Sequence, residues 1–271
     1  MTAALPIALV VSDIDGTLVT PDKRITPAAR AAVAALRQRG IGFSLTSSRP
    51  SYGMQALITE LDLQLPIGPF NGSSIVAPDL TVIEQHVVPP DAARQSLSFL
   101  ARKGFDIWLF TNREWIAHRD DDRYVPREQH AIRTAPRFVA DSTPFVDQAC
   151  KIVGVSNDYA KLAEGEAELQ ALIGAHAHVA RSQNYYLDIT PPDRDKGTFV
   201  TALGARLGLP PARIATIGDM PNDVPMFGVS GLSFAMGNAS DAVKAKAGRI
   251  TATNTEDGFA RAMDEILHIG E

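Results

Sequence analysis

The chain has 271 residues, of which 45% are hydrophobic and 21% charged, a composition typical of a soluble globular protein with one large domain or two modest ones. A net charge of −5 and the absence of any dense Lys/Arg run argue against binding to nucleic acid or to an anionic membrane. The apolar run at residues 5–11 is too short to span a bilayer and lacks the flanks of a signal peptide, and the single cysteine, Cys150, excludes an internal disulfide, so we expect a cytoplasmic protein.

The first seventy residues alternate predicted strands and helices. Residues 7–11 are a continuous apolar, β-branched run, typical of a strand buried on both faces. Thr26-Pro27 predicts the start of a helix, and Gly40 predicts its end. The next predicted elements are a strand at 41–46, a helix at 50–61 and a strand at 66–70. This order predicts a parallel sheet with right-handed crossovers.

The pattern changes after Asn71-Gly72, a strong turn signal. The elements expected here are a hairpin at 74–76 and 82–88, helices at 91–103 and 159–174, and strands at 105–111, 149–155, 176–181 and 185–190, with a polar stretch up to about residue 147. We interpret residues 84–187 as an inserted α+β domain. Residues 1–83 and 188–271 then form one core domain.

The strand–helix alternation resumes after the second predicted boundary, at residue 188. It predicts helices at 196–207, 221–227, 241–247 and 257–269 and strands at 213–217 and 232–235. In an open parallel sheet, the loops at the carboxyl ends of neighbouring strands meet at one crevice, where ligands bind. Polar residues at these strand ends are therefore the candidates for a functional site.

Three patches of acidic and hydroxyl residues follow predicted strands: residues 13–17, Ser47-Ser48 and residues 218–223. We expect them to converge, and because like charges do not gather without a cation, we predict a divalent metal among them. Asp13-Ile14-Asp15-Gly16 resembles the start of a calcium loop, but the residues that follow supply no further oxygen ligands at the required spacing.

The Asp13 and Asp15 pair suits phosphoryl chemistry. An ionised carboxylate can attack phosphorus, and a second carboxyl can protonate the leaving oxygen and later deprotonate water. Asp219, Asn222 and Asp223 are spaced to lie near one face of a helix's first turn, where metal ligation is a good explanation for them. Lys196, just inside a predicted helix, supplies a cation for phosphoryl oxygens, and the Ser47 hydroxyl supplies a donor.

Together these patches resemble the four motifs of the haloacid dehalogenase (HAD) superfamily of phosphohydrolases. Residues 13–18 match Asp-x-Asp-Gly-Thr-Leu, Ser47 and Lys196 stand at the second and third motifs, and residues 218–223 match Gly-Asp-x-x-Asn-Asp. The insertion and the tail Ala235-Met236-Gly237-Asn238-Ala239 resemble the Cof-type subfamily with a type IIB cap. The resemblance implies a Rossmann-like, three-layer α/β core with an inserted α+β cap that sets substrate specificity.

The resemblance also implies roles for individual residues. Asp13 would be the nucleophile and Asp15 the general acid/base, and Mg²⁺ would be held by Asp13, the carbonyl of Asp15 and Asp219. The residues implied to contact phosphate or substrate, or to support those that do, are Ser47, Ser48, Asn71, Lys196, Asn222 and Asp223. Ser48 replaces the glycine that is frequent in the second motif.

Three functions remain open at this stage. The favoured one is Mg²⁺-dependent hydrolysis of a small phosphomonoester, such as a sugar phosphate, pyridoxal phosphate or flavin mononucleotide, through an aspartyl-phosphate. The others are a sugar phosphomutase of the same fold and a non-catalytic binding module phosphorylated at an aspartate. Asp15 argues against the last, because a stable aspartyl-phosphate has no use for an acid two residues after the nucleophile. The sequence carries no signal for an oligomeric state.

Overall fold

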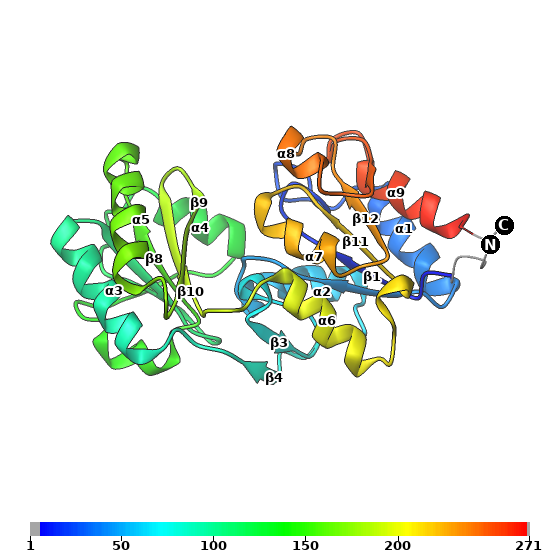
Figure 1. Cartoon of the computed structure of the whole chain (residues 1–271). Coiled ribbons are helices and arrows are strands. Elements are labelled where there is room, and N and C mark those ends of the chain that lie inside the picture. Colours follow the sequence, from blue (N-terminus) through cyan, green and yellow to red (C-terminus); the bar gives the residue numbers. More distant parts are fainter. Residues whose placement is uncertain (1–5, 270–271) are drawn as a thin grey trace. The chain divides into compact units, whose positions relative to one another are not determined.

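A computed structural model of the protein describes residues 6–269. The chain divides into two compact units (Figure 1). The core unit comprises residues 6–48, 55–83 and 195–269, and the second unit comprises residues 49–54 and 84–194. The chain passes from one unit to the other between residues 83 and 84 and returns between residues 194 and 195. The boundary expected after residue 187 falls inside strand β10 (Tyr186–Thr190), which pairs with two strands of the second unit.

The core unit is built on a five-stranded, entirely parallel sheet. Its strands, in spatial order, are β13 (Arg249–Ile250), β12 (Leu232–Ala235), β11 (Ile214–Gly218), β1 (Leu9–Ser12) and β2 (Gly42–Leu45). All residues of β1 and β11 are buried, as expected for strands covered on both faces. Since β1 lies between β2 and β11, its carboxyl end has a neighbouring strand end on each side.

Helices cover both faces of this sheet, which makes the core a three-layer structure (Figure 1). Helices α6 (Lys196–Arg206) and α7 (Val224–Gly228) pack against Leu9 and Val11 of β1. On the other face, Phe43 of β2 meets Phe259 of α9 (Gly258–Leu267) edge to face, and α1 (Pro27–Gln38) contacts α9. The predicted fold class, a parallel α/β core with an α+β insertion, is confirmed.

Thr26 caps α1 as predicted: its side chain accepts a hydrogen bond from the backbone N–H of Ala29. The remaining short helices of the core are α2 (Gln55–Leu61) and α8 (Asp241–Lys244), with 3₁₀ turns at Phe70–Gly72, Pro211–Arg213 and Pro221–Asp223. The strand predicted at 66–70 is wrong. Only the single bridges Thr46↔Gly68 and Ile67↔Val76 form, because the chain turns at Phe70 and Asn71, which both have positive φ.

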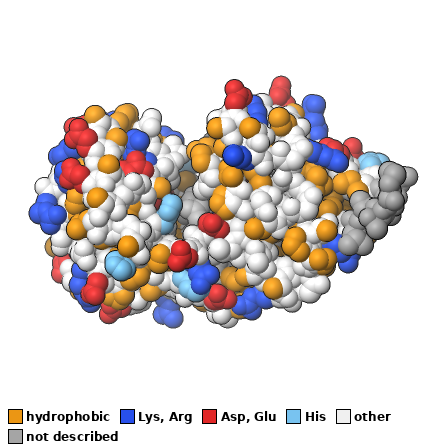
Figure 2. Space-filling view, in the orientation of Figure 1, with side chains coloured by type: hydrophobic (Ala, Val, Ile, Leu, Met, Phe, Trp, Pro, Cys, Tyr) orange, Lys and Arg blue, Asp and Glu red, His pale blue; other side chains and the backbone are white. Residues whose placement is uncertain are grey.

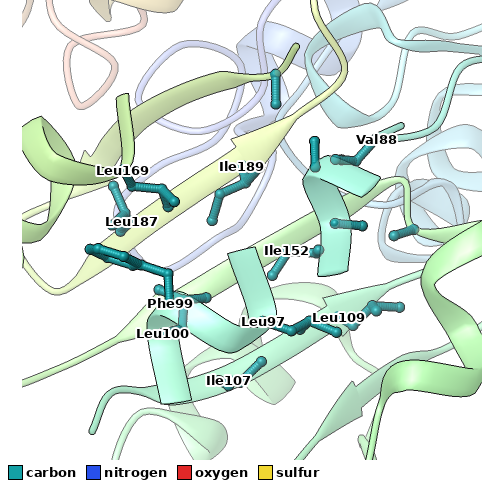
Figure 3. Close-up of a cluster of buried hydrophobic side chains, with 14 of the residues drawn as sticks. Val88, Leu97, Phe99, Leu100, Ile107, Leu109, Ile152, Leu169, Leu187 and Ile189 are labelled. Atoms are coloured by element: carbon teal, nitrogen blue, oxygen red, sulfur yellow. The ribbon is translucent and has the colours of Figure 1, made fainter. Parts of the chain in front are cut away.

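The second unit contains a six-stranded mixed sheet. Its strands, in spatial order, are β7 (Arg137–Phe138), β6 (Trp115–Ala117), β5 (Asp106–Phe110), β8 (Lys151–Val155), β10 and β9 (His178–Gln183). Helices α3 (Pro90–Lys103) and α5 (Tyr159–Ile173) contribute side chains to one hydrophobic cluster with β5, β8 and β10. Figure 3 shows Leu100, Ile152 and Leu187 of this cluster converging from three of these elements.

The polar stretch expected up to about residue 147 contains more structure than its composition predicts. It includes β6, β7, the helix α4 (Val125–Ile132) and a 3₁₀ turn at Thr143–Gln148. Pro126 near the start of α4 is the available sequence signal for that helix. The predicted hairpin is present as the two-stranded sheet of β3 (Ser74–Val76) and β4 (Val82–Gln85).

Acidic and basic side chains are interspersed on the face shown in Figure 2, with no extended basic patch there. Among residues 6–269, no helix combines the length and apolar character needed to cross a bilayer.

Candidate active site

The three predicted strand-end patches lie at one edge of the core sheet. Asp13 follows β1, and its backbone N–H donates to the carbonyl of Ile217 in β11 at 3.0 Å. Asp219 follows β11, and Ser47 follows β2. Because β1 pairs in parallel with both neighbours, the sheet itself brings these residues together.

Lys196 connects two of the acidic residues. Its Nζ donates to Asp13 Oδ1 and to Asp223 Oδ1, each at 2.6 Å. The lysine side chain is 1% exposed, Asp13 is 6% exposed and Asp223 is fully buried. Asp195 fixes the position of Lys196, because it caps α6 in a reciprocal capping box with Thr198.

The charges of this cluster do not balance. Burial, reinforced by the nearby Asp223 and Asp219, raises the pKa of Asp13 well above its ordinary value even though Lys196 opposes that shift. Burial and the charge of Asp223 raise the pKa of Asp219 to about 6. For Lys196, burial alone would lower the pKa, but the two carboxylates raise it above its ordinary value. The cluster therefore has an excess of negative charge that a cation would stabilise.

The donor set fits a divalent metal ion. Carboxylate oxygens of Asp13, Asp219 and Asp223 lie within 4.8 Å of one another, and all three residues are buried. Asp223 accepts three hydrogen bonds, one from the ammonium group of Lys196 and two from the backbone N–H groups of Asp219 and Met220 at 2.8 Å. Within residues 6–269, Asp13 accepts a side-chain hydrogen bond only from Lys196, and Asp219 accepts two from neutral side chains. Asp13 and Asp219 are therefore the better ligands, and hard oxygen donors of this kind suit Mg²⁺.

The turn after β1 requires glycine at position 16. Gly16 has φ +86°, and a Cβ there would lie 2.2 Å from Asp219 Oδ2. The next residue, Thr17, donates its hydroxyl to Asp219 Oδ1 at 3.0 Å. The Asp-Gly-Thr sequence thus lets the chain turn tightly against Asp219 and hold it.

Asp15 lies at the edge of the cluster and forms an ion pair with Lys23, 2.6 Å from Nζ to Oδ1, in which both side chains are 33% exposed. Lys23 has φ +62° in a turn closed by two backbone hydrogen bonds, from Lys23 N–H to Thr20 O and from Thr20 N–H to Arg24 O. Val19 and Ile25 form an antiparallel bridge at the base of this turn. The carboxyl of Asp15 is therefore more accessible to a substrate than that of Asp13.

The remaining predicted residues form a second, polar group. Asn222 Nδ2 donates to Asn71 Oδ1 at 3.0 Å, and the backbone N–H of Asn71 donates to the carbonyl of Ser47 at 2.7 Å. Asn71 has the left-handed backbone (φ 57°, ψ 33°) that asparagine tolerates. Ser47 is buried and Ser48 is half-buried beside it. These hydrogen bonds bring Asn71, Asn222 and Ser47 together, and Ser48 follows Ser47 in the chain.

Three residues in contact with the acidic cluster have no role assigned from the sequence: Thr17, Lys23 and Asn238. Thr17 belongs to the first patch and Asn238 to the tail motif, whereas Lys23 lies in no motif. Asn238 lies after β12, at the same edge of the sheet, and its Nδ2 donates to Asp219 Oδ2 at 3.2 Å. Its position after a parallel strand is a signal that could have identified it. Lys23 carries no comparable signal, because its role follows from the conformation of a turn.

Comparison with known proteins identifies relatives over almost the whole chain. Residues 10–263 match the family model described as haloacid dehalogenase-like hydrolase. A 5-amino-6-(5-phospho-D-ribitylamino)uracil phosphatase from Bacillus subtilis strain 168 is 25% identical, over 94% of this chain and 96% of its own length.

Solved structures agree with this match. The crystal structure of a haloacid dehalogenase-like hydrolase from Bacteroides thetaiotaomicron is 30% identical, covers 96% of this chain and 99% of its own, and has a TM-score of 0.89. A HAD subclass IIB sugar phosphatase is 20% identical, with coverage of 95% of this chain and 98% of its own and a TM-score of 0.83, and so shares the fold.

Proposed function

Because the chain belongs to the family of haloacid dehalogenase-like hydrolases, we propose that it is a divalent-metal-dependent phosphatase that acts on a small phosphorylated metabolite. The family predicted from the four motifs is confirmed. The observation that carries the proposed chemistry is the buried contact of Asp13 with Lys196, beside Asp219 and Asp223.

In the proposed reaction, a carboxylate oxygen of Asp13 attacks the phosphorus of the substrate while the bond from phosphorus to the leaving oxygen breaks. Asp15 donates its proton to that oxygen. A water molecule then attacks the phosphorus of the aspartyl-phosphate, Asp15 accepts the proton of this water, and the carboxylate of Asp13 is regenerated with release of phosphate. The partly exposed position of Asp15 supports its role at the leaving oxygen.

Asp13 must be ionised to attack, and its burial opposes ionisation. Lys196 supplies one compensating positive charge. We propose that Asp13, Asp219 and the carbonyl of Asp15 hold Mg²⁺, which when bound would neutralise negative charge on the carboxylates and on the phosphoryl group. Asp223 supports this arrangement by holding Lys196 and the backbone at Asp219.

We further propose that Ser47, Ser48, Asn71, Asn222 and Lys196 hold the phosphoryl oxygens or the adjoining part of the substrate. The hydrogen-bonded pair of Asn71 and Asn222 supports this proposal, since it places two amide groups in one polar group with Ser47. A transferring phosphoryl group spreads charge over three oxygens, which need such donors.

We propose that the second unit, predicted at residues 84–187 and extending in the structure to residue 194, selects the substrate. One relative is named for a ribitylaminouracil phosphate and another for sugar phosphates, which supports a small phosphomonoester as substrate class. A cytoplasmic location is part of the same proposal, and the buried free thiol of Cys150 is compatible with it.

The test is phosphate release from a panel of sugar phosphates, pyridoxal phosphate and flavin mononucleotide, with and without a chelator. We expect release from at least one member, its loss after treatment with EDTA, and its recovery on addition of Mg²⁺. An isomerised sugar phosphate without free phosphate would indicate a mutase. Absence of any reaction with Mg²⁺ present would contradict the proposed function.

A further inference from the structure

The side chain of Asn238 is exposed but makes hydrogen bonds with all of its polar groups. Its Nδ2 donates to Gly16 O at 2.9 Å and to Asp219 Oδ2 at 3.2 Å, and its Oδ1 accepts a hydrogen bond from the backbone N–H of Asn254 at 3.0 Å. The identity of these partners fixes the orientation of the amide, because its nitrogen faces two acceptors and its oxygen faces a donor.

Asn238 connects three separate loops at the active-site edge of the sheet. These are the turn after β1, the loop after β11 and the loop that contains Asn254. The last of these is itself attached to the turn after β1, since Asn254 Nδ2 donates to Val19 O at 2.8 Å. Asn254, which donates to Asn238 Oδ1, is therefore itself fixed to the turn after β1.

The consequence for Asp219 is that each of its carboxylate oxygens has one neutral donor. Thr17 donates to Oδ1 at 3.0 Å, and Asn238 donates to Oδ2. Asp223 differs, because its Oδ1 pairs with the ammonium group of Lys196. Neutral donors restrict the rotation of a carboxylate and leave its charge available, whereas an ammonium group neutralises it.

We propose that Asn238 is a positioning residue for the cation site: it orients the Asp219 carboxylate and fixes the Gly16 carbonyl beside the Asp13–Asp15 segment. This inference rests on the proposed function, since it assumes a divalent cation at Asp13 and Asp219. Hydrogen-bond partners that orient metal ligands commonly contribute about 10- to 100-fold to metal affinity.

The test compares wild-type protein with Asn238→Leu, which is close to asparagine in shape and removes all three hydrogen bonds. Binding of Mg²⁺ alone is measured by isothermal titration calorimetry, and thermal unfolding is measured without metal. We expect Mg²⁺ to bind Asn238→Leu at least about 10-fold more weakly.

The matched control is Ser240→Ala, two residues further along the same loop, which removes the hydrogen bond that Val243 N donates to the Ser240 hydroxyl at the cap of α8. Within residues 6–269 the Ser240 side chain makes no hydrogen bond to a residue of the site. We expect this variant to bind Mg²⁺ like the wild type. Unchanged affinity in Asn238→Leu, or an equal loss in both variants, would overturn the inference. Wild-type protein that binds no Mg²⁺ would instead contradict the proposed function, and the inference with it.

Discussion

Replacing Asp13 with asparagine is expected to reduce phosphate release by at least about a thousandfold, because an amide cannot attack phosphorus and nothing else in the cluster can take its place. Thr17 holds the carboxylate of Asp219, and the backbone N–H of Asp219 holds that of Asp223. Asp15 is the proposed general acid and base. Steady-state rates with the best substrate of the panel, at saturating Mg²⁺, measure this effect.

The fold of this variant should survive. Burial already disfavours the ionised form of Asp13, and Lys196 keeps Asp223 as a partner. Circular dichroism and thermal unfolding check this. The matched control is Asp264→Asn, which neutralises an exposed carboxyl on α9 of the same unit and should leave the rate within about twofold. Retention of a substantial rate by Asp13→Asn would show that another group is the nucleophile.

Replacing Lys196 with methionine is expected to damage both stability and turnover. The substitution keeps the length of the side chain but leaves Asp13 and Asp223 buried without their shared cation. Breaking a buried ion pair in this way typically costs about 3–5 kcal/mol. The rate should fall by about 100-fold or more, because the phosphoryl group loses a positive partner and Asp13 becomes harder to ionise.

Urea denaturation in the absence of metal measures the stability of this variant, and kinetics at saturating Mg²⁺ measure its turnover. The control is Arg30→Met, which removes an exposed ion pair with Glu60 in the same unit and should cost less than about 1 kcal/mol. If Lys196→Met were as stable and as active as the control, the buried ion pairs would have no role in the site.

Most of the site could be predicted from the sequence because one topological rule positions it. Parallel strands bring their carboxyl ends to one edge, so polar residues after β1, β2 and β11 had to meet there. The sequence also places Lys196 at a helix start, where Asp195 holds it. No comparable rule applied to Lys23, whose position depends on a turn with an unusual backbone conformation.

The boundaries of the inserted unit were harder to predict because they depend on packing. The strand expected at 185–190 was assigned to the insertion, but the boundary predicted after residue 187 cut through it, and its pairing with β8 and β9 assigns all of β10 to the second unit. Residues 49–54 likewise group with that unit, since Gly53 lies against Ile132 of α4 so closely that a Cβ would be 2.9 Å from Ile132 Cβ.

The most direct test of the catalytic proposal is detection of the covalent intermediate. Asp15→Asn should slow hydrolysis of the aspartyl-phosphate, since the water would lose its base. This variant is mixed with substrate and Mg²⁺, quenched in acid and analysed by mass spectrometry of its peptides. We predict a phosphoryl group on the peptide containing residue 13, and none when Asp13→Asn is added to the same protein. Phosphate release with the phosphoryl group on another residue, or on none, would contradict the account.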